Sequence, residues 1–267
     1  MDLQLDGKRA IVTGGSRGIG KAIARALAAE GCDVVIVARG EEALRAAAGE
    51  LAAETGRAIT PIVCDTSSDE SVQAAMRDAV AALGGGADIL VNCAATASGQ
   101  AAPTTPLEVT DDNYWADMNV KVLGYLRTAK EIAPLMVDQG WGRIINISGL
   151  GARNAGAILT SMRNVSVAAL TKNLADELGP KGVNVTVVHP GTTRTEATPG
   201  VIARRAQATG ASEADVERQM SEGNVIRKMV DARDVAAVVA FLASPLSVAI
   251  TGDAIATGGG APRSIYY

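Results

Sequence analysis

The chain has 267 residues, of which 48% are hydrophobic but only 3% are aromatic. This length suits one large domain, whose core must be built mainly from aliphatic side chains. The formal net charge of −4 gives no basic surface, which argues against nucleic acid as a partner. The cysteines Cys32, Cys64 and Cys93 are scattered through apolar segments, so we expect free thiols in a reducing compartment.

The N-terminal segment has no basic stretch followed by an apolar run, so we expect no secretion signal. The longest apolar runs, such as Val34–Ala38, have the length of a strand and are too short to span a membrane. We therefore expect a soluble, cytoplasmic protein that has neither a membrane segment nor a metal site.

Short aliphatic runs alternate with longer alanine-rich amphipathic segments along the chain. None of these runs alternates apolar and polar residues, which is typical of strands buried on both faces. The predicted strands are Ala10–Val12, Val34–Ala38, Ile59–Cys64, Ile89–Asn92, Ile144–Ile147 and Val183–Val188. The predicted helices are Lys21–Glu30, Glu41–Glu54, Ser71–Leu83, Tyr114–Gln139 and Val165–Leu178. This order predicts a doubly wound parallel sheet of the Rossmann type, in three α/β/α layers.

No flexible linker and no internal repeat divides the chain, so we expect a single domain over residues 1–267. The segment Glu196–Gly223 is more polar, contains Pro199–Gly200 and lies between a strand and the last helix, which indicates a short helical lid. Pro134 lies inside the longest predicted helix and is expected to kink it.

The first predicted strand leads through the sequence TGGSRGIG, residues 13–20, directly into a helix. Glycines at such a turn let the backbone approach a pyrophosphate, which then faces free N–H groups at the helix N-terminus. The residues expected to form this loop are Gly14, Ser16, Arg17, Gly18, Ile19 and Gly20. The sequence therefore predicts a dinucleotide site.

The spacing Thr-Gly-x-x-x-Gly-Ile-Gly resembles that of the short-chain dehydrogenase/reductase family. Further features match at the family's positions: Asp65, Asn92–Ala95, Asn119, Pro190 and Gly191 with Thr195, Phe241–Ser244, Thr251–Gly252 and Gly258–Gly259. The resemblance covers nearly the whole chain. It implies that Asp65 and Thr66 flank the adenine, that Asn92 and Ala94 lie on the ribose side, and that Thr195 binds the carboxamide. It also implies a homotetramer or homodimer, which the family forms through its fourth and fifth helices.

The choice of cofactor can be read from charge. Enzymes that select NAD carry a carboxylate near the end of the second strand, where it binds the ribose 2′-hydroxyl. Here that strand ends in Val37, Ala38 and Arg39, with no carboxylate. Arg39 and Arg17 suit a 2′-phosphate instead, so we predict NADP(H). The alternative is that both arginines are solvated surface residues.

The catalytic motif of the family is a tyrosine and a lysine four residues apart, preceded by a serine after the fifth strand. Anchored on the helix motif Ala169–Leu174, the chain has Thr160 at the tyrosine and Asn164 at the lysine. Anchored instead on the strand Arg143–Ile147, it has Gly149 at the serine position, and Met162 and Ser166 at the pair. We prefer the helix anchor, because the helix carries these residues. Under either anchor the Tyr–Lys pair is absent.

A threonine hydroxyl ionises far above the tyrosine pKa of about 10 and cannot replace it as an acid near neutral pH. Asparagine carries no charge that would lower a neighbouring pKa. The residues that we expect at the reacting end are Asn119, Ser148, Thr160 and Asn164, with Ser148 first and Ser161 as a second hydroxyl that could polarise a carbonyl. Asn119 has the alternative of a residue that caps a helix kink. His189 is a weaker candidate, and Lys121 and Lys172 are interpreted as solvated or interfacial.

The leading hypothesis is a divergent oxidoreductase of this family. It would transfer a hydride between NADP(H) and a small carbonyl or alcohol, or an activated alkene, whose reduction needs less acid assistance. One alternative is a catalytically silent protein that binds the cofactor or supports an active paralogue. Another is a lyase or isomerase that uses the same pocket.

Overall fold

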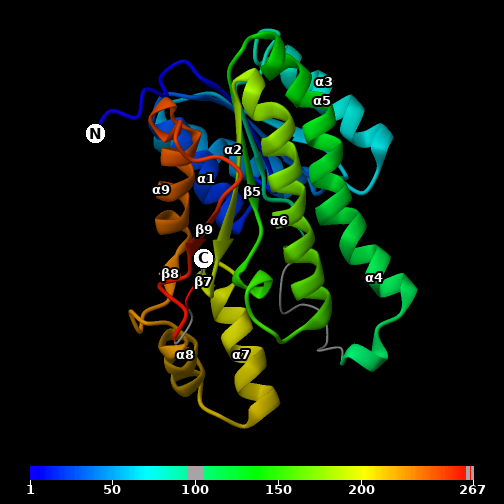
Figure 1. Ribbon diagram of the computed structural model, residues 1–267. Helices are drawn as coiled ribbons and strands as arrows, with labels where there is room; N and C mark the ends of the chain where they lie inside the picture. Colours follow the sequence, from blue (N-terminus) through cyan, green and yellow to red (C-terminus); the bar gives the residue numbers. More distant parts are fainter. Residues whose placement is uncertain (96–104, 263–264, 266–267) are drawn as a thin grey trace.

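A parallel sheet of seven strands forms the centre of the computed structural model, which describes residues 1–95, 105–262 and 265 (Figure 1). The strand order is β3-β2-β1-β4-β5-β6-β9. In that order the strands are Ile59–Val63, Asp33–Ala38, Arg9–Thr13, Ile89–Asn92, Gly142–Ile147, Val183–Pro190 and Ala254–Thr257. Every neighbouring pair is parallel, which confirms the predicted Rossmann-type sheet.

Helices cover both faces of the sheet, because its strands present aliphatic side chains to both sides. In β1, Ala10 and Val12 pack into one core cluster, whereas Ile11 packs into the other. The helices of the first cluster are α1 (Gly18–Ala29), α2 (Glu41–Thr55) and α9 (Ala232–Ala243). Those of the second are α3 (Asp69–Ala82), α5 (Gly124–Asp138) and α6 (Ile158–Leu178). This arrangement gives the three predicted layers.

The long predicted helix is divided in an unexpected place. It consists of α4 (Asp111–Met118), a π-helical turn over Asn119–Leu123, and α5. Helix α5 runs through Pro134, and the carbonyl that Pro134 leaves without a helical partner belongs to the exposed Lys130. The irregularity therefore lies at the π turn rather than at Pro134, and such turns are frequent at functional sites.

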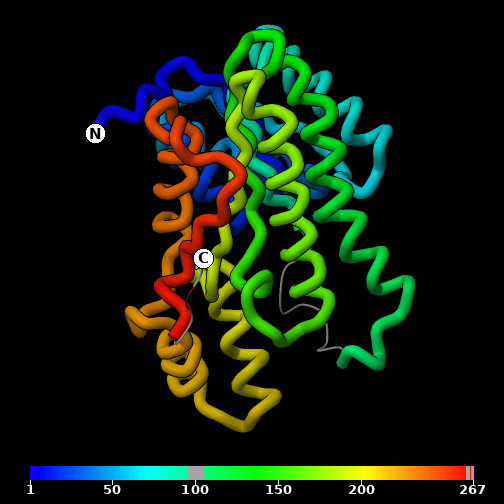
Figure 2. Tube along the Cα trace, viewed as in Figure 1, coloured from blue at the N-terminus to red at the C-terminus, as the bar shows by residue number. Residues whose placement is uncertain are grey.

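The segment predicted as a lid forms two helices, α7 (Thr198–Thr209) and α8 (Glu213–Glu222). They extend together beyond the carboxyl end of β6 (Figures 1 and 2). Two short strands, β7 (Thr193–Arg194) and β8 (Val230–Asp231), pair in parallel where this excursion leaves and rejoins the domain. The remaining elements are 3₁₀ turns at Pro106–Glu108, Leu150–Ala152, Gly179–Lys181 and Pro245–Ser247.

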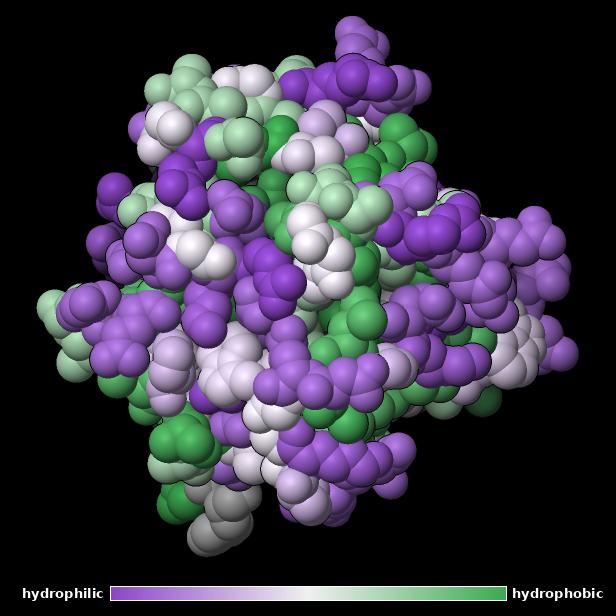
Figure 3. Space-filling view, turned by 90° about the horizontal axis from the view of Figure 1, so that it is seen from above, coloured by the Kyte–Doolittle hydropathy of each residue, from purple (hydrophilic) through white to green (hydrophobic). Residues whose placement is uncertain are grey.

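The surface is mixed in character. On the face seen from above, hydrophilic residues surround smaller hydrophobic areas (Figure 3). Within the part of the chain that the structure describes, no helix combines the length and apolar character needed to cross a membrane.

Candidate active site

The glycine turn between β1 and α1 is held against the neighbouring strand β4. The Thr13 hydroxyl oxygen accepts hydrogen bonds from the N–H groups of Cys93 (3.0 Å) and Ala94 (3.1 Å). Gly14 has a positive φ of 69°, and a Cβ there would lie 3.0 Å from the backbone of Cys93 and Ala94. A Cβ on Gly20 would overlap the Gly14 carbonyl oxygen. Glycine is thus required at both positions.

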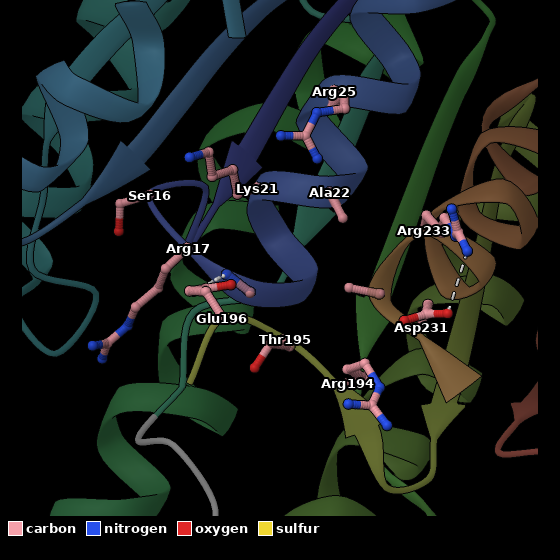
Figure 4. A pocket seen from close by; sticks show the side chains of 12 residues that line it. Ser16, Arg17, Lys21, Ala22, Arg25, Arg194, Thr195, Glu196, Asp231 and Arg233 are labelled. Atoms are coloured by element: carbon pink, nitrogen blue, oxygen red, sulfur yellow. Dashed lines mark hydrogen bonds and ion pairs between the residues drawn. The ribbon is translucent and has the colours of Figure 1, made fainter. Parts of the chain in front are cut away.

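The N-terminus of α1 binds an anionic group that the chain itself supplies. The Gly18 N–H donates a hydrogen bond of 2.8 Å to Oε1 of Glu196. The side chain of Arg17, the N-cap residue, accepts no hydrogen bond from the helix. Figure 4 shows Glu196 against the turn that begins α1. Free N–H groups and the helix dipole favour negative charge at this place. The terminus is therefore an anion site, which the Glu196 carboxylate fills.

A large crevice of about 1430 Å³ runs along the carboxyl ends of the strands. It extends from Arg39 at the end of β2, past the glycine turn, to Ser148 and Gly149 after β5 and to helix α7. The sheet order places β1 beside β4, so the direction of winding reverses between them. Open α/β sheets bind ligands at the carboxyl edge of such a reversal.

The crevice is strongly cationic. Among the described residues that line it, the basic ones are Arg17, Arg39, Lys121, Arg163, Arg204 and Arg205, and the one acidic residue is Glu196. Arg17 and Arg39 are exposed and lie at the end formed by the glycine turn and β2. β2 ends at Ala38, followed by Arg39, with no carboxylate there, although Glu196 accepts from the Gly18 N–H and the charge of Arg39 contributes to the lowered pKa of Asp65. The charge and shape therefore suit a dinucleotide with several phosphates.

Most of the predicted cofactor residues line this crevice. They are Gly14, Ser16, Arg17, Gly18, Ile19, Gly20, Arg39, Thr66, Ala94, Pro190, Gly191 and Thr195. Asp65 and Asn92 do not line it. The Ser67 N–H and hydroxyl both donate to Asp65 Oδ1, and these bonds, the backbone one first, hold the pKa of that carboxyl below its usual value.

Asn92 belongs to a buried polar chain inside the sheet. Its Nδ2 donates to Oδ1 of Asn146 (3.0 Å), and its Oδ1 accepts from the Thr128 hydroxyl (2.7 Å). Asn146 in turn donates to the Thr171 hydroxyl oxygen at 2.9 Å. The side chain of Asn92 therefore joins β4 to β5 and α5, a structural role that the sequence interpretation missed.

A second, smaller cleft of about 630 Å³ adjoins the crevice at the start of α1 (Figure 4). The two share the lining residues Ser16, Arg17, Gly18, Thr195 and Glu196. Its basic side chains are largely paired with carboxylates: Lys21 with Glu50, Arg25 with Glu54, Arg194 with Glu217, and Arg233 with Asp231. These pairs compensate the charge of the cleft, so it is a weaker anion site than the crevice.

At the far end of the crevice, Ser148, Thr160 and Asn164 line its wall together. The Ser148 hydroxyl donates to the Asn164 carbonyl at 3.0 Å. The positions given by the strand anchor lie elsewhere: Met162 is 41% exposed, and the Ser166 hydroxyl donates to the Met162 carbonyl. The structure therefore favours the helix anchor.

Asn119 is engaged away from the crevice wall. Its Nδ2 donates to the Ser67 carbonyl (3.2 Å), and its Oδ1 accepts from Nη1 of Arg127 (2.8 Å). These contacts tie the π turn to the loop after β3, which favours the structural interpretation of this residue.

Lys121 is the residue that the sequence interpretation placed wrongly. It is buried, with 4% of its surface exposed, rather than solvated. Its Nζ donates to the Ser148 carbonyl (3.0 Å) and to Oδ1 of Asn164 (3.1 Å). Its pKa is lowered to about 7, first by burial and then by the charge of Arg163. Lys172, by contrast, is exposed and pairs with Asp176.

Neither His189 nor a tyrosine of the described chain lines the crevice. His189 is buried, its Nδ1 accepts from the Gly149 N–H (3.4 Å), and burial lowers its pKa to about 4, so it is neutral at neutral pH. The Tyr125 hydroxyl donates to the Ile147 carbonyl, and Tyr114 packs against Trp115. Neither tyrosine lines the crevice, and the two C-terminal tyrosines lie outside the described residues.

Comparison with known proteins decides the family. The profile described as Enoyl-(Acyl carrier protein) reductase matches residues 14–261. The chain is 35% identical over 254 residues to the short-chain reductase protein NovJ of Streptomyces niveus, covering 95% of this chain and 93% of that protein. The chain belongs to the short-chain dehydrogenase/reductase family. The chain is also 31% identical to the 3-oxoacyl-[acyl-carrier-protein] reductase FabG of Aquifex aeolicus, over 97% of this chain and 99% of that protein.

The fold of this short-chain dehydrogenase/reductase agrees with a solved relative. The L-sorbose reductase of Gluconobacter frateurii, complexed with NADPH and L-sorbose, superposes with a TM-score of 0.92. The match covers 99% of this chain and 100% of that one at 27% identity. The sequence resemblance to the family is therefore confirmed over the whole chain.

Proposed function

We propose that this chain is an NADP(H)-dependent oxidoreductase that transfers a hydride between the cofactor and a small carbonyl or alcohol, or an activated alkene. The observation that carries the proposal is the cationic crevice at the reversal of the sheet, with Arg17 and Arg39 at one end and no carboxylate among the residues that end β2. Guanidinium groups bind a 2′-phosphate, whereas NAD-selecting sites place a carboxylate there. The NADPH complex of the L-sorbose reductase supports the same choice.

The described residues fit this cofactor. The glycine turn leaves room for a backbone approach, and the Gly18 N–H already binds a carboxylate oxygen. Gly14, Ser16, Gly18, Ile19 and Gly20 would hold the pyrophosphate. In the proposal, the adenosine side is lined by Thr66 and Ala94. Asp65 and Asn92 support that side without lining the crevice. Pro190, Gly191 and Thr195 receive the nicotinamide end. When bound, NADPH supplies the hydride.

The reacting end has an atypical set of side chains. Thr160 and Asn164 stand where the family has its tyrosine and lysine, and Ser148 lies beside them. Ser148 donates its proton to the Asn164 carbonyl, so its oxygen is free to accept but its proton is committed. We infer that Thr160 orients the substrate oxygen and that Ser148 accepts from a substrate hydroxyl. Asn164, and Asn119 at the π turn, hold the local structure. Such a site reduces ordinary ketones slowly, because positioned acids contribute a factor of about 10²–10⁴.

The two helices of the lid complete the crevice. Arg204 and Arg205 on α7 line it, opposite the wall formed by α6. We infer that residues 196–223 close over bound ligands, as a lid on a single catalytic domain does. From the sequence we also expect residues 94–106 to line the pocket, and most of them lie outside the described residues.

An apolar surface on α4 and α6 suits assembly. Trp115, Met162 and Val165 are exposed by 58%, 41% and 50% on these helices. We infer that a second copy of the chain covers this surface in a homodimer or homotetramer, since exposed apolar patches mark interaction sites. The three cysteines are free, as a cytoplasmic location would allow.

A second candidate is a silent NADP(H)-binding protein that supports an active relative. It is favoured by the committed proton of Ser148 and by the lack of a tyrosine among the described residues of the crevice wall. A lyase or isomerase is a further alternative, and no contact among the described residues of the site favours it.

The test is consumption of NADPH carrying deuterium at C4, with a panel of ketones, aldehydes, quinones and enones. The proposal expects slow but measurable turnover, with deuterium transferred to the product carbon. Binding of NADPH without transfer to any member of the panel would overturn it in favour of the silent candidate. Substrate conversion without loss of NADPH would point to the non-redox alternative.

A further inference from the structure

The π turn places a lysine beneath the reacting end of the crevice. Asn119–Leu123 is wound with one residue more per turn than an α-helix, and Lys121 lies in its middle. The Lys121 side chain is buried and lines the crevice next to Ser148 and Asn164. Two of its three N–H donors bind the Ser148 carbonyl and Asn164 Oδ1, at 3.0 and 3.1 Å. The third has no acceptor within the described chain.

The partner of Lys121 is informative in itself. Asn164 occupies the position where other family members carry the lysine that holds the nicotinamide ribose. Its amide oxygen accepts from Lys121, and its amide nitrogen faces Gly149, where a Cβ would lie 2.9 Å from Nδ2. An ammonium group therefore lies beside position 164, although it comes from a different helix.

We propose that Lys121 directs its third N–H into the crevice and contacts the nicotinamide end of the bound cofactor, in place of a lysine at position 164. The inference rests on the proposed function only in that the cofactor is a nicotinamide dinucleotide. It does not require turnover. Replacement of one lysine by another from a neighbouring element preserves the positive charge while changing its direction of approach.

Lys121 is surrounded by groups that keep their charge state near neutral pH. Arg163 and Asp117 form a buried ion pair, with Arg163 4% exposed. Burial raises the pKa of Cys93 to about 12 and lowers that of His189 to about 4, so both are neutral. Because the pKa of Lys121 is about 7, its amine is largely neutral above neutral pH. It must take up a proton from solvent when a cofactor that contacts the ammonium binds there.

The test is calorimetric titration with NADPH at about pH 6 and about pH 9, each in two buffers of different ionisation enthalpy, which together report the protons taken up. The variants are Lys121→Met and Lys121→Arg, with Lys172→Met as the exposed control. We expect the unmodified protein to bind more weakly at the higher pH and to take up protons there. Lys121→Met should weaken binding by about 10-fold or more at the lower pH and should lose the proton uptake at the higher pH, since hydrogen bonds to charged groups are strong. Lys121→Arg, whose charge does not titrate, should take up no protons at the higher pH.

Chemical unfolding provides a second measurement if Lys121→Met proves unstable. The folded pKa of about 7 lies below the ordinary 10.5, so the unfolded chain binds more protons between these values. The free energy of unfolding of the unmodified protein should therefore rise with pH over that range, and it should not do so in either Lys121 variant.

The outcomes separate this inference from the proposed function. Proton-linked NADPH binding that depends on Lys121 supports the inference, even if no carbonyl is reduced. Equal affinity and equal proton uptake in the unmodified protein and Lys121→Met would overturn it, even if turnover is observed. Failure of the unmodified protein to bind NADPH would overturn both.

Discussion

The two ends of the crevice differ in the groups that form them: backbone at one end and side chains at the other. At the β1–α1 turn the binding groups are backbone N–H donors, and glycines at positions such as Gly14 and Gly20 create the space. At the start of α6 the reacting end depends on side chains, and here Thr160, Asn164 and the distant Lys121 form the wall. The first end keeps the family pattern in sequence and in structure. At the second end, the ammonium group beside Asn164 belongs to Lys121 in the π turn.

This comparison shows which property survives a change of residues. A pyrophosphate cradle tolerates little substitution, because any Cβ at its closest contacts would strike the backbone. A proton-handling site needs charge and position, and these can come from any element that reaches the same point. Four predictions test how independent the two ends are.

The largest effect is expected from rebuilding the family pair. Thr160→Tyr and Asn164→Lys together should raise carbonyl reduction by about 10²–10⁴, but only when Lys121→Met is added. With Lys121 present, two ammonium groups would share one buried site, and like charges there oppose each other. A Cβ at Gly149 would meet the Asn164 amide, and Asn164→Lys removes that amide. Gly149→Ser can therefore be added in the same variant. Steady-state NADPH oxidation is the measurement.

The control for this prediction is the pair without Lys121→Met. Equal rates with and without that third change would show that Lys121 does not occupy the site of the restored lysine.

The cofactor end should respond sharply to one methyl group. Gly20→Ala should weaken NADPH binding by roughly 100-fold, because overpacking against the Gly14 carbonyl costs up to about 3 kcal/mol. The matched control is Gly49→Ala on α2, which meets no atom within 4 Å and should stabilise the helix by about 0.5–1 kcal/mol. Fluorescence titration with NADPH would check both, and unchanged affinity in Gly20→Ala would contradict the cradle.

Cofactor preference should follow Arg39. The unmodified protein should bind NADPH more tightly than NADH by roughly 1–3 kcal/mol, and Arg39→Asp should erase or reverse the difference. Arg45→Asp, at an exposed arginine that pairs with Glu41 on α2, should leave the preference unchanged. Dissociation constants from calorimetry are the measurement. A preference that persists in Arg39→Asp would assign the 2′-phosphate to other groups.

The smallest effect is expected from Glu196, whose carboxylate binds the N-terminus of α1. A bound pyrophosphate must displace Glu196 from the Gly18 N–H, and its charge repels the phosphates. Glu196→Gln should therefore tighten NADPH binding by roughly 0.3–1 kcal/mol, the usual contribution of one charge at a helix terminus. Weaker binding in this variant would instead make Glu196 part of the cofactor site.

The sheet and its covering helices could be predicted because continuous aliphatic runs specify strands buried on both faces. The short pair β7–β8 gave no such signal, since two residues per strand carry no periodicity. The π turn was also invisible, because the apolar pattern across Tyr114–Gln139 is the same with or without one inserted residue. Helix α5 continues through Pro134, so the kink expected there does not end the helix.

The dinucleotide site is predicted by the glycine turn between a strand and a helix together with matches at family positions, whereas the contacts at the reacting end could not be predicted. The burial of Lys121 depends on the π turn and on the contact with Asn164, residues 43 positions apart. Asn92 and Asn119 were assigned by family position, and their amides are committed to Asn146 and to Arg127. A lysine two residues after Asn119, together with an asparagine at position 164, is the signal that would have suggested the exchange.

The most direct test of the contrast is a single-turnover experiment. The unmodified protein is mixed rapidly with NADPH and a carbonyl substrate, and cofactor fluorescence and absorbance are followed together. The account predicts a rapid, saturable binding phase, followed by a hydride phase slower by about 10²–10⁴ than in Lys121→Met/Thr160→Tyr/Asn164→Lys. A hydride phase equally fast in both proteins would contradict it, because the reacting end would then already hold a complete acid.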